Sequence, residues 1–242
     1  MEKYELQSFK QKTGYNLEQL ELDYYQHFIL SRLFDLFNTV YFKGGTCLQK
    51  CYGIKRFSED LDFNYFDLPP TEIISQIENV CEEKITDYHE TRFGMSFKIR
   101  FKGILFNGSN QSLCRVSFDF RENDIYNQPI KKIIRPIYYD LPNYFILALN
   151  TEEILAEKIR AIITRYKARD VFDLNELLLN NVKVDFNLIN KKLQTYNKIF
   201  IRKTFEIKLE EKRKIYDQEL QRLTKVYDDF DTCKVNILKQ IE

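Results

Sequence analysis

The feature that most constrains this chain is a pair of glycines and a threonine placed between a strand-like stretch and a short helix. Gly44, Gly45 and Thr46 follow the apolar residues 40–42 and open residues 46–53, which favour a helix. Backbone N–H groups at a helix N-terminus have no intrahelical partner and attract anions. Glycine lets a phosphate approach the backbone closely. The run therefore predicts a phosphate-binding turn, with an ordinary tight turn as the alternative.

A second pattern follows within a few residues. Asp60 and Asp62 alternate with apolar residues up to Tyr65, as in a β-strand. Side chains two apart on a strand point to the same side. Mg²⁺ usually takes one or two carboxylates together with substrate phosphates, so the pair predicts a site for Mg²⁺, with Mn²⁺ as a second candidate. The alternative is a solvated edge strand. Together, the two patterns predict a nucleoside triphosphate site in an enzyme that transfers nucleotidyl groups.

Two polar residues near this run are further candidates for nucleotide binding. Lys50 stands towards the end of the short helix, where it could neutralise a phosphate or be an ordinary surface residue. Ser58 precedes the aspartate strand and could contact a phosphate or cap a turn. Both alternatives stay open for each residue.

The patterns around the run predict an α/β part over residues 1–149. An amphipathic helix is expected over 17–38, and another after Pro69-Pro70 through about residue 84. Alternating apolar residues predict two strands, 93–101 and 113–121, joined by a hairpin at Gly108.

The rest of the chain reads differently. Prolines at 129, 136 and 142 indicate a loop-rich bridge that includes residues 130–139. Asn150 can cap a helix, with Glu152 and Glu153 in the first turn, where the helix dipole favours acids. From there residues 150–242 are predicted to form a helical domain.

The second hairpin strand contributes a third acid. Asp119 lies between Phe118 and Phe120, on the same side of its strand as Ser117 and Arg121. Two metal ions can stabilise the attacking and leaving oxygens of an in-line displacement, and a third carboxylate from a neighbouring strand would help to hold them. A solvated acid on an exposed sheet face is the alternative.

The motifs resemble a known family. Gly-Gly-Thr-x-Leu-x-Lys followed by Arg-Phe-Ser-Glu-Asp-Leu-Asp-Phe is similar to the toxin component of AbiE-type abortive-infection systems, the AbiEii/AbiGii toxins, which are related to MenT toxins. A second match is Glu153 to Lys158 (Glu-x-x-x-x-Lys) followed by Arg-Asp-x-x-Asp-Leu at 169–174. The matched residues extend from about 43 to 174, and residues 175–242 carry no motif that matches.

The resemblance implies an α+β fold: a polymerase-β-like minimal nucleotidyltransferase sheet with an added C-terminal helical domain. In such a fold Asp119 would be the third metal ligand. The resemblance also implies that Lys158 reaches a phosphate and that Asp170 lines the catalytic site. The alternatives are a solvated face for Lys158 and ion pairs of Asp170 and Asp173 with Arg165 or Arg169.

Composition adds few constraints. The chain has 242 residues, 44% of them hydrophobic, a net charge of +1, and five cysteines that we interpret as free thiols. It has no run of 18 apolar residues, so no membrane span is expected. The first five residues lack the pattern of a signal peptide. We therefore expect a cytoplasmic protein with no membrane partner.

One stretch of the helical part suggests the acceptor. Five basic residues and no acid lie between Asp185 and Glu206, interleaved with aromatic residues; they are Lys191, Lys192, Lys198, Arg202 and Lys203. Cations and aromatic rings on one face can follow an RNA backbone and stack its bases. The alternative is a solvated helical surface whose aromatic rings face the core.

The hypothesis is therefore a cytoplasmic, Mg²⁺-dependent nucleotidyltransferase of toxin type, using a nucleoside triphosphate. The resemblance implies that the acceptor is RNA, at the 3′ end of transfer RNA, that translation is blocked in phage defence, and that a separately encoded antitoxin exists. Two alternatives stay open. One is transfer to a small molecule or a protein hydroxyl, and the other is an inactive module of the same fold that binds RNA or a protein.

Overall fold

The computed structural model describes residues 1–241, and the chain divides into two compact units. The sheet unit comprises Met1–Tyr52, Phe57–Asn123 and Pro129–Ala148. The helical unit comprises Gly53–Arg56, Asp124–Gln128 and the chain from Leu149 onwards. Two loops from the N-terminal part thus belong to the helical unit, whereas the sequence predicted a single division after residue 149.

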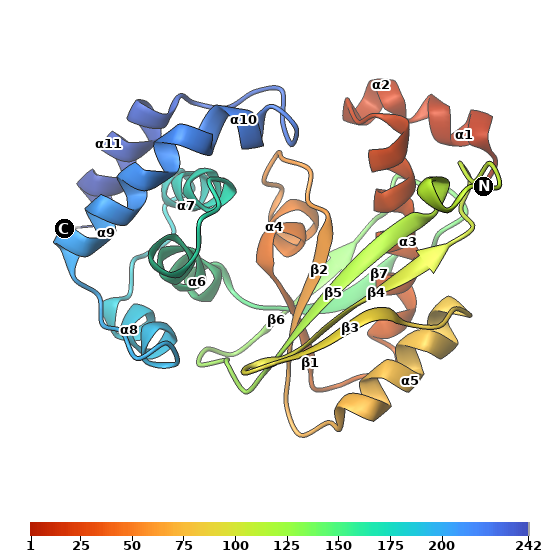
Figure 1. The fold of residues 1–242 in the computed structure, drawn as a ribbon, viewed down its shortest axis with the longest axis horizontal. Helices are drawn as coiled ribbons and strands as arrows, with labels where there is room; N and C mark the ends of the chain where they lie inside the picture. The colour runs from red at the N-terminus through yellow and green to blue at the C-terminus, as the bar shows by residue number, and fades with distance from the viewer. Residues whose placement is uncertain (242) are drawn as a thin grey trace. The chain divides into compact units, whose positions relative to one another are not determined.

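A seven-stranded mixed sheet organises the sheet unit, with the strand order β3-β4-β5-β2-β1-β7-β6 (Figure 1). The strands are β1 Val40–Lys43, β2 Asp60–Tyr65, β3 Thr86–Thr91, β4 Gly94–Phe101, β5 Cys114–Glu122, β6 Ile130–Ile134 and β7 Tyr144–Ala148. The pairs β2–β5 and β1–β7 are parallel, and the others are antiparallel. The predicted hairpin is confirmed as the antiparallel pair β4–β5.

The two faces of this sheet differ sharply. Alternate residues of β4 and β5, such as Phe97, Phe118 and Phe120, are almost fully buried. Phe97 and Phe118 stack with ring centroids 5.0 Å apart. Burying a Phe side chain contributes about 1.5–3 kcal/mol, so these rings anchor the sheet. We call this side the core face and the opposite side, which bears Asp60 and Asp62, the polar face.

The sheet unit also contains helices. They are α1 Lys3–Ser8, α2 Lys10–Thr13, α3 Leu17–Leu33, α4 Gly44–Tyr52 and α5 Pro70–Cys81, with a 3-10 turn η1 at Asn110–Ser112. α3 contacts β5, β7 and α5, so α3 and α5 lie on the same side of the sheet (Figure 1). α3 ends at Leu33, five residues before the predicted end at 38.

Two strands depart from the sequence-based expectation. Residues 130–139 were predicted to be loop-rich, but β6 and β7 form an antiparallel pair. The three prolines lie just outside both strands and therefore bound them without interrupting them. β3 was not predicted because it is an edge strand with almost no buried side chain, so it lacks the apolar alternation.

The helical unit contains α6 Thr151–Thr164, α7 Arg169–Leu179, α8 Phe186–Gln194, α9 Arg202–Glu210, a 3-10 segment η2 Glu211–Ile215, α10 Tyr216–Leu220 and α11 Phe230–Gln240. The predicted cap is confirmed, because the Asn150 side chain accepts a hydrogen bond from Glu153 N at 2.9 Å. α6 is buried continuously from Glu153 to Ile163 and packs against α7, α8 and α9. The predicted α+β class and C-terminal helical part are confirmed. Within residues 1–241, every helix falls short of the length and apolar character that a membrane crossing requires.

Candidate active site

The start of α4 lies against the aspartate strand. α4 begins directly at Gly44, whose φ of +74° is in the left-handed region. A Cβ at this position would overlap Asp62 Oδ2. Glycine is therefore required here both for its backbone angle and for the close approach of Asp62. The phosphate-binding turn and the metal-binding strand predicted from the sequence are neighbours in the fold.

Thr46 and Gly45 are buried at the junction of α4 and β2. Thr46 is fully buried, and its hydroxyl donates a hydrogen bond to the carbonyl oxygen of Asp60 at 2.5 Å. Gly45 is buried beside it in the first turn of α4. The Thr46 hydroxyl thus ties the helix start to the first residue of β2, and its predicted phosphate contact stays a prediction.

Three carboxylates lie on the polar face. Asp60 and Asp62 share it by alternation, and Asp119 is the direct neighbour of Asp62 in the parallel β2–β5 pair. The side chain of Asp119 is 43% exposed, and its Oδ1 lies 3.8 Å from Arg121 Nε. Across residues 1–241, no three His, Cys, Asp or Glu side chains converge closely enough to hold a metal ion by themselves.

The residues nevertheless fit a divalent cation that shares its ligands with a substrate. A hard cation needs only one or two carboxylates when phosphates complete its shell. Asp62 lies against the backbone of Gly44, so an ion at Asp60 and Asp62 would lie next to the start of α4, where phosphates are favoured. The residues that fit a divalent cation are therefore Asp60 and Asp62, with Asp119 next to Asp62 on the neighbouring strand.

Two further residues of this face were not predicted as site residues. Lys43 is 3% exposed and is the register partner of Asp62 on β1. Asn64, two residues after Asp62, is fully buried, and neither its side-chain oxygen nor its nitrogen has a hydrogen-bond partner. An unsatisfied buried amide costs about 1–3 kcal/mol. The alternation through Asn64 is the sequence signal that could have identified it.

Ser58 lies in a tightly held loop before β2. Its backbone N–H donates to Gln49 Oε1 at 3.1 Å, and its carbonyl accepts from Gln26 Nε2 at 3.0 Å. Only 6% of the residue is exposed. Two helices, α3 and α4, thus fix the position at which the aspartate strand begins.

Lys50 forms a buried ion pair with a residue of α3. Its Nζ lies 2.6 Å from Asp23 Oδ1 on α3, and its side chain is 2% exposed. Asp23 also accepts from the hydroxyl of Tyr138 at 2.8 Å, and His27 Nε2 lies 3.7 Å away. Burial alone would raise the pKa of Asp23, but the Lys50 ammonium and the hydrogen bond from Tyr138 lower it. The ion pair joins α4 to α3, and the phosphate contact of Lys50 stays a prediction.

His27 belongs to the same network. Its Nδ1 lies 2.8 Å from the hydroxyl of Tyr144. Burial, reinforced by Lys50, lowers the pKa of His27 to about 3. The ring is therefore neutral at neutral pH.

Lys158 and Asp170 form part of a buried charge cluster in the helical unit. Lys158 Nζ lies 3.1 Å from Asp170 Oδ1 and 2.7 Å from Asp173 Oδ2. Arg165 donates to both oxygens of Asp170, at 2.7 Å each. Burial would raise the pKa of Asp170, yet Lys158 and Arg165 hold it well below its usual range. The structure contains the alternative considered for Asp170, which is an ion pair with Arg165. The Asp170 carboxylate therefore holds the side chains of Lys158 and Arg165 in place.

Arg56 was missed as a partner of this cluster. Its Nε and Nη2 donate to the two oxygens of Asp173 at 2.5 and 2.7 Å, and both side chains are almost fully buried. Arg56 belongs to one of the two loops that the helical unit takes from the N-terminal part. Arg56 lies two residues before Ser58 in the motif. Because Arg56 and Asp173 are far apart in the sequence, their pairing could not be predicted from it.

The basic stretch of the helical part requires a correction. Lys192 was predicted to follow RNA, but its side chain is fully buried and lies 2.8 Å from Glu153 Oε1 and 3.4 Å from Glu157 Oε1. Arg202 donates to the backbone oxygens of Ile241 and Leu238. The buried acids of α6 hold Lys192, because an isolated buried ammonium would be far too costly.

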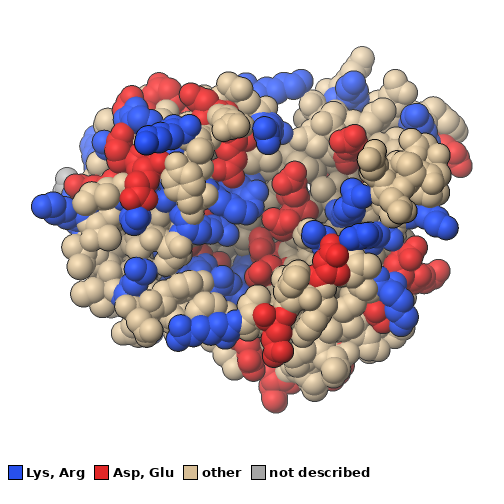
Figure 2. Space-filling model, viewed as in Figure 1, with Lys and Arg blue, Asp and Glu red and all other residues tan. Residues whose placement is uncertain are grey.

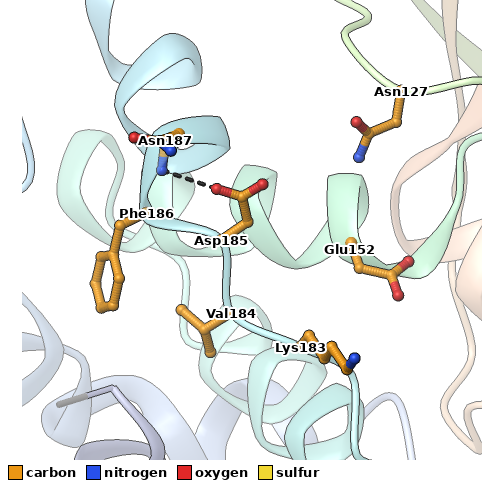
Figure 3. A pocket seen from close by; sticks show the side chains of 7 residues that line it. All are labelled: Asn127, Glu152, Lys183, Val184, Asp185, Phe186 and Asn187. Atoms are coloured by element: carbon orange, nitrogen blue, oxygen red, sulfur yellow. Dashed lines mark hydrogen bonds between the residues drawn. The ribbon is translucent and has the colours of Figure 1, made fainter.

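The helical unit also has an open cavity of about 500 Å³ (Figure 3). It is lined by Asn127, Glu152, Lys183, Val184, Asp185, Phe186 and Asn187. The Asp185 carboxylate accepts from Asn187 N at 2.8 Å and so caps α8. The seven lining residues include none of the predicted site residues.

Comparison with known families identifies the class of protein. Residues 29–235 match the family described as nucleotidyl transferase AbiEii toxin, type IV toxin–antitoxin (TA) system. The chain therefore belongs to the AbiEii nucleotidyl transferase toxin family, and it is a nucleotidyltransferase. This confirms the resemblance inferred from the motifs. Such enzymes generally use a nucleoside triphosphate and a divalent metal, and a type IV system implies an antitoxin.

Two solved structures share the fold. MenT4, a nucleotidyltransferase toxin from Mycobacterium tuberculosis H37Rv, is 19% identical with a TM-score of 0.68, covering 99% of this chain and 88% of that one. JHP933 from Helicobacter pylori is 19% identical with a TM-score of 0.57, covering 92% of this chain and 90% of that one. A comparison with curated protein sequences gives no match.

Proposed function

We propose that this protein transfers a nucleotidyl group from a nucleoside triphosphate to a hydroxyl of RNA, at the 3′ end of transfer RNA, and that it does so in the cytoplasm as the toxin of a phage-defence system. The observation that carries the proposal is the contact between Gly44 at the start of α4 and Asp62 on the polar face. Family membership supports the reaction class.

In this proposal Asp60 and Asp62 hold Mg²⁺, with Asp119 as a further ligand. The bound ion would supply charge neutralisation at the phosphates. Gly44 and Gly45 are proposed to let phosphate oxygens reach the N–H groups at the start of α4, and Thr46 and Ser58 keep the strand and the helix start in register. Lys158 and Asp170, which the family motif implies for catalysis, are proposed to act in the same reaction, with Asp170 as a positioning residue that orients Lys158.

The reaction is a single displacement at phosphorus. The acceptor hydroxyl oxygen bonds to the α-phosphorus and loses its proton to solvent. The bond from the α-phosphorus to the bridging oxygen breaks, and pyrophosphate leaves. Positioning and electrostatic stabilisation account for most of the rate in reactions of this kind.

The test is to incubate the purified protein with each α-³²P-labelled triphosphate, Mg²⁺ or Mn²⁺, and total RNA. We expect label in RNA of transfer-RNA size, and nuclease digestion should map it to the 3′ end. Label only in small molecules or in protein would contradict RNA as the acceptor. No label under any condition would support an inactive binding module.

A further inference from the structure

The strands beside β2 present a group of cations on the polar face. On β4 and β5 the residues of this face are polar, whereas their neighbours in sequence are buried in the core. The space-filling view has Lys and Arg side chains over this part of the sheet, with acidic ones next to them (Figure 2). We call Lys98, Arg100 and Arg115 the cationic strip.

Strand register places the strip next to the aspartates. Asp60 pairs with Ser117 on β5, and Ser117 pairs with Lys98 on β4, so these three residues form one row. Neighbouring strands lie about 4.8 Å apart, so the backbone of Lys98 is roughly 10 Å from that of Asp60. Arg115 and Arg100 form the next row, about 7 Å further along the strands.

The sheet itself does not explain why these residues are cationic. Arg100 and Arg115 are directly opposite each other, and like charges at such positions destabilise a sheet. The side chains of Lys98 and Arg100 are 43% and 38% exposed, and Arg115 is exposed. Arg100 Nε has no hydrogen-bond partner. An anionic partner would relieve this repulsion.

One acidic side chain partly neutralises the positive charge of the cationic strip. Asp87 on β3 accepts from Arg100 Nη2 at 3.0 and 3.2 Å and lies 3.3 Å from Lys98 Nζ. Asp87 sits at a register irregularity and has a φ of +52°, a strained angle for this residue. Its side chain is 37% exposed, so this is a surface ion pair of modest strength. A phosphate can therefore compete with Asp87 for both cations.

We infer that the cationic strip binds the phosphate backbone of the RNA acceptor strand and leads its end towards Asp60 and Asp62. This inference rests on the proposed function and adds the surface that holds the substrate. Phosphate contacts position a nucleic acid without reading its sequence. The two rows of the strip match a strand of successive phosphates that ends at the carboxylates.

The first test compares two triple variants of the full chain. One is Lys98→Gln, Arg100→Gln and Arg115→Gln; the matched control is Lys214→Gln, Lys225→Gln and Lys239→Gln, which removes three exposed cations of the helical unit. Transfer-RNA affinity is measured at several salt concentrations. The strip variant should flatten the slope of log K against log salt by about 0.7 for each lost phosphate contact. It should label RNA poorly at low RNA concentration, and the control should match wild type.

A second variant has an effect of the opposite sign. Asp87→Asn leaves Lys98 and Arg100 without their acidic partner, so RNA should bind more tightly and with a steeper salt slope. A merely structural role of the three charges would not produce this gain. If the strip variant is unfolded in a thermal melt, the RNA affinity of the Asp87→Asn protein still tests whether the cationic strip binds RNA.

The outcomes separate the inference from the proposed function. If wild type labels RNA while the strip variant keeps the wild-type affinity and slope, the inference is wrong and the proposed function stands. An Asp87→Asn protein that binds RNA no better than wild type would equally contradict the inference. If wild type binds triphosphate but labels no RNA, the proposed function fails and the inference fails with it.

Discussion

The aspartates of the sheet unit and those of the helical unit were predicted for the same site, but they have opposite environments. Asp60 and Asp62 are half-buried on the polar face, beside the start of α4. Asp170 and Asp173 are fully buried, and Lys158, Arg165 and Arg56 supply hydrogen bonds to their oxygens. A carboxylate that is saturated by cations holds them in place, whereas an accessible one can bind a metal ion. The comparison teaches that residue type and motif do not fix a role until the partners are known.

The largest expected effect tests the accessible pair. Asp60→Asn combined with Asp62→Asn should reduce nucleotidyl transfer by about a thousandfold or more, since electrostatic stabilisation worth several kcal/mol is lost. The unfolding free energy should change by less than about 1 kcal/mol, because both sites are partly exposed. Label transfer and chemical denaturation measure the two quantities, with Asp67→Asn as an exposed control. Wild-type transfer by the double variant would remove these residues from the metal site.

The buried pair should behave in the reverse way. Asp173→Asn leaves Arg56 and Lys158 with an uncompensated buried charge, which costs about 3–5 kcal/mol of folding stability. Asp231→Asn is the matched control, since Asp231 forms an ion pair with Arg213 but its side chain is 71% exposed. The control should lose no more than about 1 kcal/mol. Equal losses in denaturant titrations of the two variants would show that burial of the cluster is not what matters.

The two units should also respond differently to pH. Burial lowers the pKa of His27 to about 3, so below its unfolded value of about 6.5 the unfolded chain binds the extra proton. Stability should therefore fall with decreasing pH, by up to about 1.4 kcal/mol per unit. The pKa values of Asp170 and Asp173 are lowered by their cations, so their contribution is lost only below about pH 4. Denaturation between pH 4.5 and 7 should give a slope in wild type and a flatter line in His27→Gln. The same slope in both would contradict the assignment.

A smaller effect is expected at the junction of α4 and β2. Gly44→Ala should cost about 1–2 kcal/mol for the left-handed backbone, and it should also reduce transfer because the new Cβ displaces Asp62. Gly53→Ala is the control: φ there is +73° and a Cβ would meet nothing within 4 Å. Both variants should lose stability in thermal melts, and only Gly44→Ala should lose activity. Full transfer by Gly44→Ala would mean that the contact with Asp62 is dispensable.

The smallest effect concerns the hydrogen bond from Thr46 to Asp60. Thr46→Val keeps the shape but removes the donor, so stability should fall by about 1 kcal/mol. Thr71→Val, at an exposed position, should be within about 0.5 kcal/mol of wild type. Equilibrium denaturation compares the two, and an unchanged Thr46→Val protein would show that this bond does not hold β2.

The sequence by itself determined the features that depend on near neighbours. Alternation set which side of β2 carries Asp60 and Asp62, and it set the buried side of β4 and β5. Gly44 and the Asn150 cap were readable because a turn or a helix start depends on a few consecutive residues. β6 and β7 were missed because their prolines resemble breakers until the strand limits are known.

Only the tertiary structure decided which charges meet. It joined Lys50 to Asp23, Arg56 to Asp173 and Lys192 to Glu153, pairs that are distant in sequence. It also brought Asp119 beside Asp62 through the parallel pairing of β2 and β5. The physical reason is that a buried charge must find a partner wherever the packing of the chain supplies one. A local sequence pattern therefore does not predict which partner a buried charge will have.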